Sequence, residues 1–119
     1  MSSARSTHIS IVLQNHAEEA AFLWLLRDVA ATAPHYSLSE LAALDERVEA
    51  HLDGLRIAGD AGWEMAREQL AIGEPGEIFA CAALAFWRGN AGEFDAVLGA
   101  AADDPALERA VISAFGWLS

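Results

Sequence analysis

The chain has 119 residues, enough for one domain with a single hydrophobic core and too few for two. Apolar residues make up 54% of it, with alanine prominent, and this composition favours closely packed helices over a sheet of β-branched residues. The chain has seven basic residues, all arginines, and eighteen acidic ones, and the formal net charge of −11 argues against nucleic-acid binding. The longest uncharged apolar run, 78–87, is too short for a membrane span of about 20 residues.

The N-terminal segment begins with partial alternation of apolar and polar side chains over residues 8–14, which predicts an extended arm or an early helical turn. The apolar stretch 9–13 is too short for a secretory signal, so we expect a cytoplasmic protein. Asn15 and Glu18 have the spacing of a capping box and predict that the first long helix begins there and closes near Pro34. Its buried stripe is predicted to comprise Ala21, Phe22, Leu25 and Val29.

A second capping box, Ser37 with Glu40, predicts a second helix that ends at Gly59. Apolar residues recur along it at helical spacing, which predicts one buried face. That face consists of Leu41, Leu44, Val48, Leu52 and Leu55. We therefore interpret residues 1–60 as an N-terminal cap of two helices.

Two similar junctions follow, Gly-Asp-Ala-Gly at 59–62 and Gly-Asn-Ala-Gly at 89–92. At each one the first glycine predicts a left-handed helix end, and the next residue, Asp60 or Asn90, predicts the N-cap of the following helix. The same register pairs Pro75 with Pro105 and Trp87 with Trp117. The sequence thus indicates two repeats of about thirty residues.

Each repeat is predicted to be a pair of helices, because an acid followed by proline in mid-repeat marks a second helix start. The expected helices span 61–72, 76–88, 91–102 and 105–118. Pairs this short bury their apolar faces only by stacking on neighbours. We therefore predict an all-α fold, a short right-handed α-solenoid in which repeats 61–90 and 91–119 pack with the cap as one domain. The run 78–87, apolar all round, predicts a helix that is covered on several sides.

The segment DDPALERAVISAFGWL, residues 103–118, resembles HEAT-like repeats of the phycobilisome-lyase type. The residues that carry this resemblance are Asp104, Pro105, Leu107, Arg109, Ala110, Ala114, Phe115 and Gly116. The segments at 14–28 and 44–59 also resemble the N-terminal part of an uncharacterised bacterial family whose longer members contain more HEAT-like repeats. Some members of that family lie beside type VI secretion components. The resemblance implies a helical-repeat solenoid and no reaction, cofactor or catalytic residue.

These patterns favour a non-enzymatic scaffold or adaptor that binds a protein partner, and no catalytic residue, cofactor or metal is predicted. Acidic residues that would line one solenoid face are expected to hold a basic segment of the partner. The predicted surface comprises Glu64, Glu68, Glu93 and Asp95, with Trp63 as either a core or a groove residue. A second apolar face is expected to meet the next repeat of a longer array, of which this chain would be a fragment, or a second copy in a homodimer. It comprises Val111, Ile112, Phe115, Trp117 and Leu118.

The alternative hypothesis is an enzyme or a small-ligand or metal site near His16, Glu19, His35 or His51. His16 and Glu19 have the i, i+3 spacing of a ligand pair, and His51 continues the packed stripe of the second helix. Simpler explanations are a solvated helix start, a surface loop for His35, and a hydrogen bond between His51 and a neighbour. Cys81, alone within the apolar run, is interpreted as an inert packing residue.

Overall fold

The computed structural model describes residues 2–118 and the side chains of residues 8–117. Across that range the chain forms six α-helices, one short 3₁₀ turn (Leu70–Ile72) and no strand, which confirms the predicted all-α class. The helices are α1 (Ser2–Ala30), α2 (Leu38–Ile57), α3 (Asp60–Gln69), α4 (Pro75–Arg88), α5 (Ala91–Ala101) and α6 (Pro105–Leu118). No helix in this range has an apolar stretch long enough to cross a membrane.

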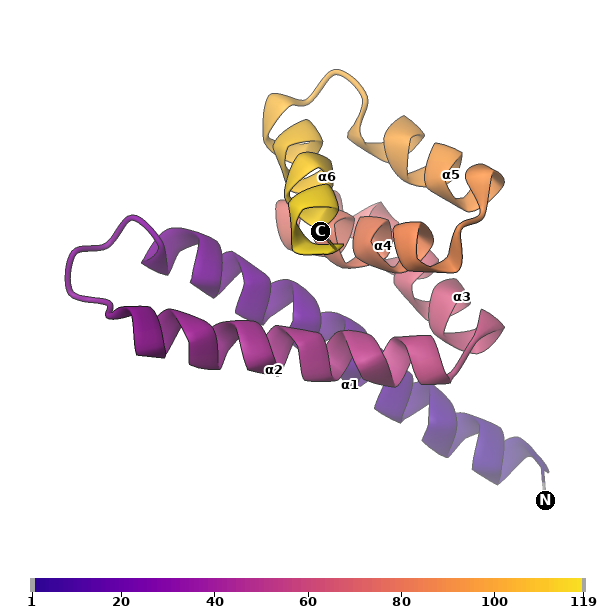
Figure 1. The fold of residues 1–119 in the computed structure, drawn as a ribbon. Helices are drawn as coiled ribbons and strands as arrows, with labels where there is room; N and C mark the ends of the chain where they lie inside the picture. The colour runs from indigo at the N-terminus through magenta and orange to yellow at the C-terminus, as the bar shows by residue number, and fades with distance from the viewer. Residues whose placement is uncertain (1, 119) are drawn as a thin grey trace.

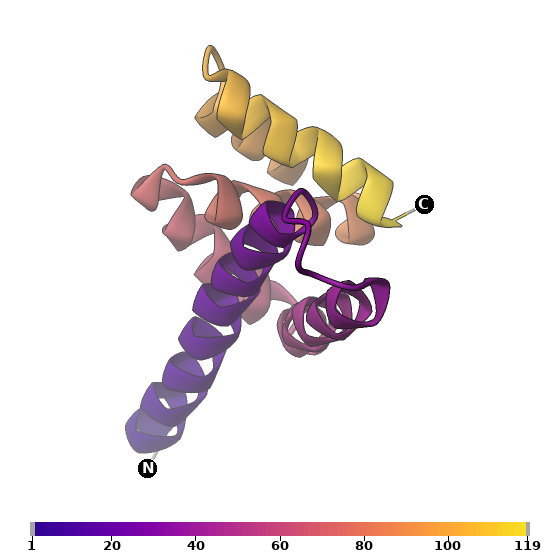
Figure 2. The same cartoon turned by 90° about the vertical axis from the view of Figure 1, so that its left-hand side faces the viewer.

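The helices are arranged as three pairs in chain order, α1–α2, α3–α4 and α5–α6 (Figures 1 and 2). In both views the middle pair lies between the outer two, and the molecule extends over 51 × 31 × 24 Å. Helix α4 is the centre of this arrangement because it packs against each of the other five helices. Its residues 78–85 are all buried, as the apolar run predicted. Among them, burial raises the pKa of the Cys81 thiol to about 12, so this cysteine packs and does not react.

Helix α1 is longer than predicted. It begins at Ser2, so residues 8–14 are helical, and the predicted helix start at Asn15 is wrong. No glycine or proline occurs between residues 2 and 30 to interrupt the helix. Leu13 belongs to the same buried face as the core residues that follow it, so packing continues through the predicted boundary.

The buried face of α1 also differs from the predicted stripe. Of the four predicted residues only Ala21 is buried; Phe22, Leu25 and Val29 are 60%, 41% and 62% exposed. The core face instead contains small residues and a few large ones, namely Leu13, Ala17, Ala20, Ala21, Leu23, Trp24 and Ala30. Small side chains occupy this face because α4 packs very close to it: a Cβ on Gly76 would lie 2.5 Å from the carbonyl oxygen of Ala21.

Helix α2 follows its prediction. The Ser37 hydroxyl accepts a hydrogen bond from the Glu40 amide at 3.1 Å, and the Glu40 carboxylate accepts one from the Ser37 amide at 2.9 Å. This capping box fixes the helix start. The predicted apolar face is the buried one: Leu44, Val48, Leu52 and Leu55 are buried, and Leu41 is half-buried.

The residues predicted to start and end helices confirm most of the predicted helix boundaries. Gly89 takes the left-handed conformation with φ of 68°, and the Asn90 side chain accepts a hydrogen bond from the Glu93 amide at 3.0 Å. Asp104 caps α6 by accepting from the Ala106 amide at 3.0 Å.

The earlier junction differs, because Gly59 itself is the N-cap of α3 and Asp60 is already helical. The predicted cap at Asp60 is therefore wrong. Its carboxylate accepts a hydrogen bond from Arg88 at 2.7 Å instead.

Candidate functional site

A groove of about 430 Å³ lies between the N-terminal half of α1 and helix α3. We call it the acidic groove, and its lining includes Ile9 and Leu13 from α1 with Glu64, Met65 and Glu68 from α3. Glu64 and Glu68 stand one helical turn apart and are exposed. The site thus combines apolar side chains from two helices with two carboxylates, both of which the sequence predicted as partner-binding residues.

Most arginines of the chain are already paired with carboxylates, so few positive charges are available to offset the other acids. Every arginine with a described side chain except Arg47 forms an ion pair with a carboxylate of the same chain. In the acidic groove Arg67 donates to Glu64 at 2.8 Å, but both side chains are at least half exposed, so this pair contributes little stability. No described residue forms an ion pair with Glu68. A basic side chain from a partner would therefore meet an available carboxylate here.

The other predicted partner-binding residues lie outside this groove. Trp63 is only 5% exposed and belongs to the core. Glu93 is half-buried and accepts hydrogen bonds from Arg88 at 2.7 and 3.0 Å, so its charge is already compensated. Asp95 is exposed on α5. The predicted acidic face is thus reduced to Glu64 and Glu68 at one site.

A second groove, about 460 Å³ in volume, lies between α5 and α6 and is almost entirely apolar. It contains three of the five residues predicted for the C-terminal face: Val111, which is buried, and Ile112 and Phe115, which are 68% and 56% exposed. Trp117 instead faces the core, where its Nε1 donates to Glu49 at 2.8 Å. The Leu118 side chain lies outside the described residues.

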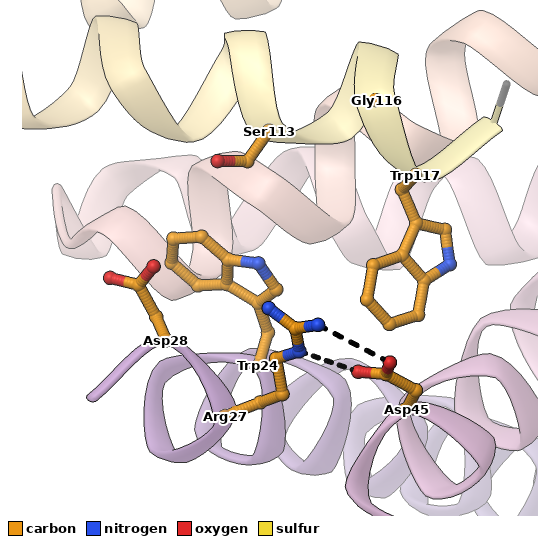
Figure 3. Close-up of a pocket in the computed structure, with 7 residues that line it drawn as sticks. All are labelled: Trp24, Arg27, Asp28, Asp45, Ser113, Gly116 and Trp117. Carbon is orange, nitrogen blue, oxygen red and sulfur yellow. Dashed lines mark hydrogen bonds and ion pairs between the residues drawn. The ribbon is translucent and has the colours of Figure 1, made fainter. Parts of the chain in front are cut away.

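A third cavity, about 430 Å³, forms where α1, α2 and α6 meet (Figure 3). We call it the tryptophan pocket; its lining is Trp24, Arg27, Asp28, Asp45, Ser113, Gly116 and Trp117. Phe79 on α4 holds both indoles, stacking on Trp24 at 4.8 Å between ring centroids and meeting Trp117 edge-on at 5.4 Å. The indoles are therefore fixed walls.

The charged residues of the tryptophan pocket are paired. Arg27 Nε donates to Asp45 at 2.7 Å, and Arg109, at the rim, donates to Asp28 at 2.8 Å. Figure 3 shows the Arg27 guanidinium between the two indoles, held on one side by Asp45. The two pairs sum to zero formal charge in a protein that is otherwise strongly acidic.

Two histidines of the alternative hypothesis meet across α1 and α2. The Nδ1 atoms of His16 and His51 are 3.0 Å apart, so one nitrogen donates and the other accepts. The centroids of the two rings are 5.2 Å apart, whereas the Nδ1 atoms are 3.0 Å apart. The Nδ1 atoms therefore lie on the sides of the rings that face each other. Gly54 makes the space, since a Cβ there would lie 2.5 Å from the His16 ring. Burial and the nearby His16 lower the pKa of His51, whereas Glu19 opposes this shift.

Of the other two residues of that hypothesis, Glu19 is half-buried on α1, and His35 lies in the α1–α2 loop with its ring against Tyr36 at 4.7 Å. It does not join the His16–His51 contact. In the described part of the chain no cluster of three or more His, Cys, Asp or Glu side chains is arranged to hold a metal ion.

We compared the chain with known proteins at three levels. Family models, curated proteins and solved structures give no match.

Sequence reasoning missed the tryptophan pocket. Arg27, Asp45 and Ser113 come from three helices and share no motif, and the sequence places Trp117 on the C-terminal apolar face and Trp24 in an apolar helical stretch. An available signal was the presence of Arg27 and Asp28 next to a tryptophan-containing apolar stretch, since ligand pockets combine aromatic side chains with a few polar groups.

Proposed function

We propose that this protein is a non-enzymatic helical-repeat adaptor that binds a basic, amphipathic segment of a protein partner in the acidic groove. The observation that carries the proposal is the position of Glu64 and Glu68 beside the apolar side chains of Ile9, Leu13 and Met65. Such a surface matches a helix that has apolar residues on one face and arginine or lysine at its edge. The three stacked helix pairs support a HEAT-like solenoid, an architecture that presents extended binding surfaces of this kind.

Charge and size both favour this type of partner. The net charge of −11 attracts basic segments over long range and accelerates their association. Helix α3 has ten residues, so it is about 15 Å long and can contact nearly three turns of a partner helix. Because the resemblance to the bacterial repeat family carries an association with secretion, basic helices from secretion components are the first natural partners to test.

The test uses the full chain and fluorescently labelled model peptides. One peptide is an amphipathic helix with arginines flanking its apolar stripe, and a matched peptide has glutamates in their place. Changing both Glu64→Gln and Glu68→Gln removes two ion pairs worth about 0.2–1 kcal/mol each, so binding of the basic peptide weakens about 2- to 30-fold at low salt. Glu46→Gln, an exposed acid on α2 outside the groove, is the matched control and leaves the affinity unchanged.

Two results contradict the proposal. One is equal binding of the basic and acidic peptides. The other is an affinity that responds neither to the double substitution in the acidic groove nor to a rise in salt concentration, because a charge-guided interaction weakens with both.

A further inference from the structure

The tryptophan pocket has no role in the proposed function, and it has the properties of a small-molecule site. Its volume of about 430 Å³ lies within the range of about 300–1,000 Å³ that is typical of ligand pockets. It is lined by two fixed indoles, of which Trp24 is almost fully buried, and by four polar side chains, those of Arg27, Asp28, Asp45 and Ser113. It lies between α1, α2 and α6, on different helical surfaces from the α1–α3 groove.

Three hydrogen-bond donors of the pocket have no acceptor among the described residues. Asp45 accepts from Nε and Nη2 of Arg27, which leaves Arg27 Nη1 without a partner among the described residues. The same holds for Trp24 Nε1 and for the hydroxyl of Ser113, each of which has no hydrogen bond within the described chain. Figure 3 shows the terminal nitrogen of Arg27 that carries no dashed line on the side of the Trp24 indole. Groups of this kind bind ligands that bring acceptor atoms.

The shape and charge of the pocket narrow the ligand class further. Indole walls favour a planar ring, because stacked or edge-on aromatic contacts contribute beyond simple burial. Asp28 and Asp45 are both neutralised by arginines, so an acceptor group, charged or neutral, meets no uncompensated carboxylate. A ligand cation would have to displace Arg27 or Arg109 from its partner.

We propose that the tryptophan pocket binds a small planar aromatic molecule that carries a carboxylate or carbonyl group. The ring lies against the two indoles beside the Arg27 guanidinium that stands between them, and the acceptor group receives hydrogen bonds from Arg27 Nη1 and Trp24 Nε1. Ser113 supplies a third donor. This ligand site is independent of partner binding in the acidic groove.

The experiment follows the indole N–H signals of the four tryptophans by NMR during titration of the ¹⁵N-labelled full chain. The probes are benzoate and nicotinamide, which carry acceptors, and benzylamine, a cation of similar size. For probes of about nine heavy atoms we expect dissociation constants in the millimolar range. Benzoate and nicotinamide shift the signals of Trp24 and Trp117. Trp63 and Trp87 do not line the pocket, so their signals stay in place and control for unfolding and for non-specific contacts.

Two variants test the location. Gly116 lines the pocket, and a Cβ added there meets no heavy atom within 4 Å, so Gly116→Leu fills the cavity without a backbone clash and abolishes the shifts. Gly99→Leu on α5 is the matched control, since Gly99 also has open space around its Cβ position and is not a lining residue. Ser113→Ala removes one donor and weakens binding about 2- to 10-fold.

Three outcomes would overturn the proposal. The first is the absence of any shift at Trp24 and Trp117 with benzoate and nicotinamide at about 10 mM, well above the dissociation constant expected for fragments of this size. The second is a set of shifts that persists in Gly116→Leu. The third is binding of benzylamine as tight as that of benzoate, which would mean that the carboxylates, and not the donors, select the ligand.

Discussion

Gly76 packs closely against the backbone of α1, and replacing it with alanine tests the contact between α1 and the central helix α4. The new Cβ would lie 2.5 Å from the carbonyl oxygen of Ala21 and 3.0 Å from its carbonyl carbon. Ordinary contacts begin at 3.4 Å, so the two helices must move apart by the difference. Because the obstructing atoms belong to the backbone, no side chain can rotate away to relieve the clash.

Overpacking of this kind costs about 1–3 kcal/mol, while alanine regains at most about 1 kcal/mol of helix propensity over glycine. The expected net loss is about 1–2 kcal/mol, measured as the free energy of unfolding in urea followed by circular dichroism. Gly99→Ala is the control: it gains helix propensity, meets no atom within 4 Å, and stabilises the protein by about 0.5–1 kcal/mol. A Gly76→Ala protein as stable as the wild type would show that α1 and α4 are farther apart than described.

Three further predictions concern titration and assembly. The pKa of His51 is lowered from 6.5 in the folded protein, so the unfolded chain binds more protons near that pH. The contribution of His51 to the free energy of unfolding is fully present above pH 6.5 and is lost as the pH falls below that value. Thermal melts between about pH 7.5 and 5.5 should show that His51→Asn reduces this pH dependence and that His35→Asn does not. Burial, with Glu74 and Glu18 nearby, raises the pKa of Glu77, so the stability that its neutral form provides is lost as the pH rises through the raised pKa. Glu77→Gln is therefore expected to stabilise the protein at pH 7 by up to about 1 kcal/mol and to have little effect at pH 4. Urea unfolding at the two pH values measures both effects. If the exposed Ile112 mediates the predicted homodimer, sedimentation at about 100 µM detects a dimer that Ile112→Asp dissociates, and a wild-type monomer at that concentration contradicts the dimer.

Local chemistry explains which parts of the fold were predictable. Ser37, Gly89 and Asp104 act through hydrogen bonds and backbone conformations within a few residues of themselves, so sequence spacing locates the helix ends. The face of α1 was mispredicted because it carries two apolar stripes. The stripe with the larger side chains, such as Phe22, is exposed, and the alanine stripe is buried because it allows the close approach of α4.

The candidate sites divide in the same way. Glu64 and Glu68 lie one turn apart on a single helix and are exposed, so the sequence could place them on one acidic surface. The contact between His16 and His51 joins residues 35 positions apart, and its existence depends on the space left by Gly54. Such pairings are decided by how helices dock, which a pattern along one helix does not encode.

The central position of α4 has a consequence for how the protein unfolds. Arrays of stacked repeats can lose their terminal units one at a time, since each unit is held by its neighbours alone. Here the single helix α4 packs against both the first and the last helix pair, so detaching either pair exposes buried apolar side chains of α4 to water. Heating is therefore expected to produce one sharp, all-or-none calorimetric transition, with no partly melted species at either end of the molecule.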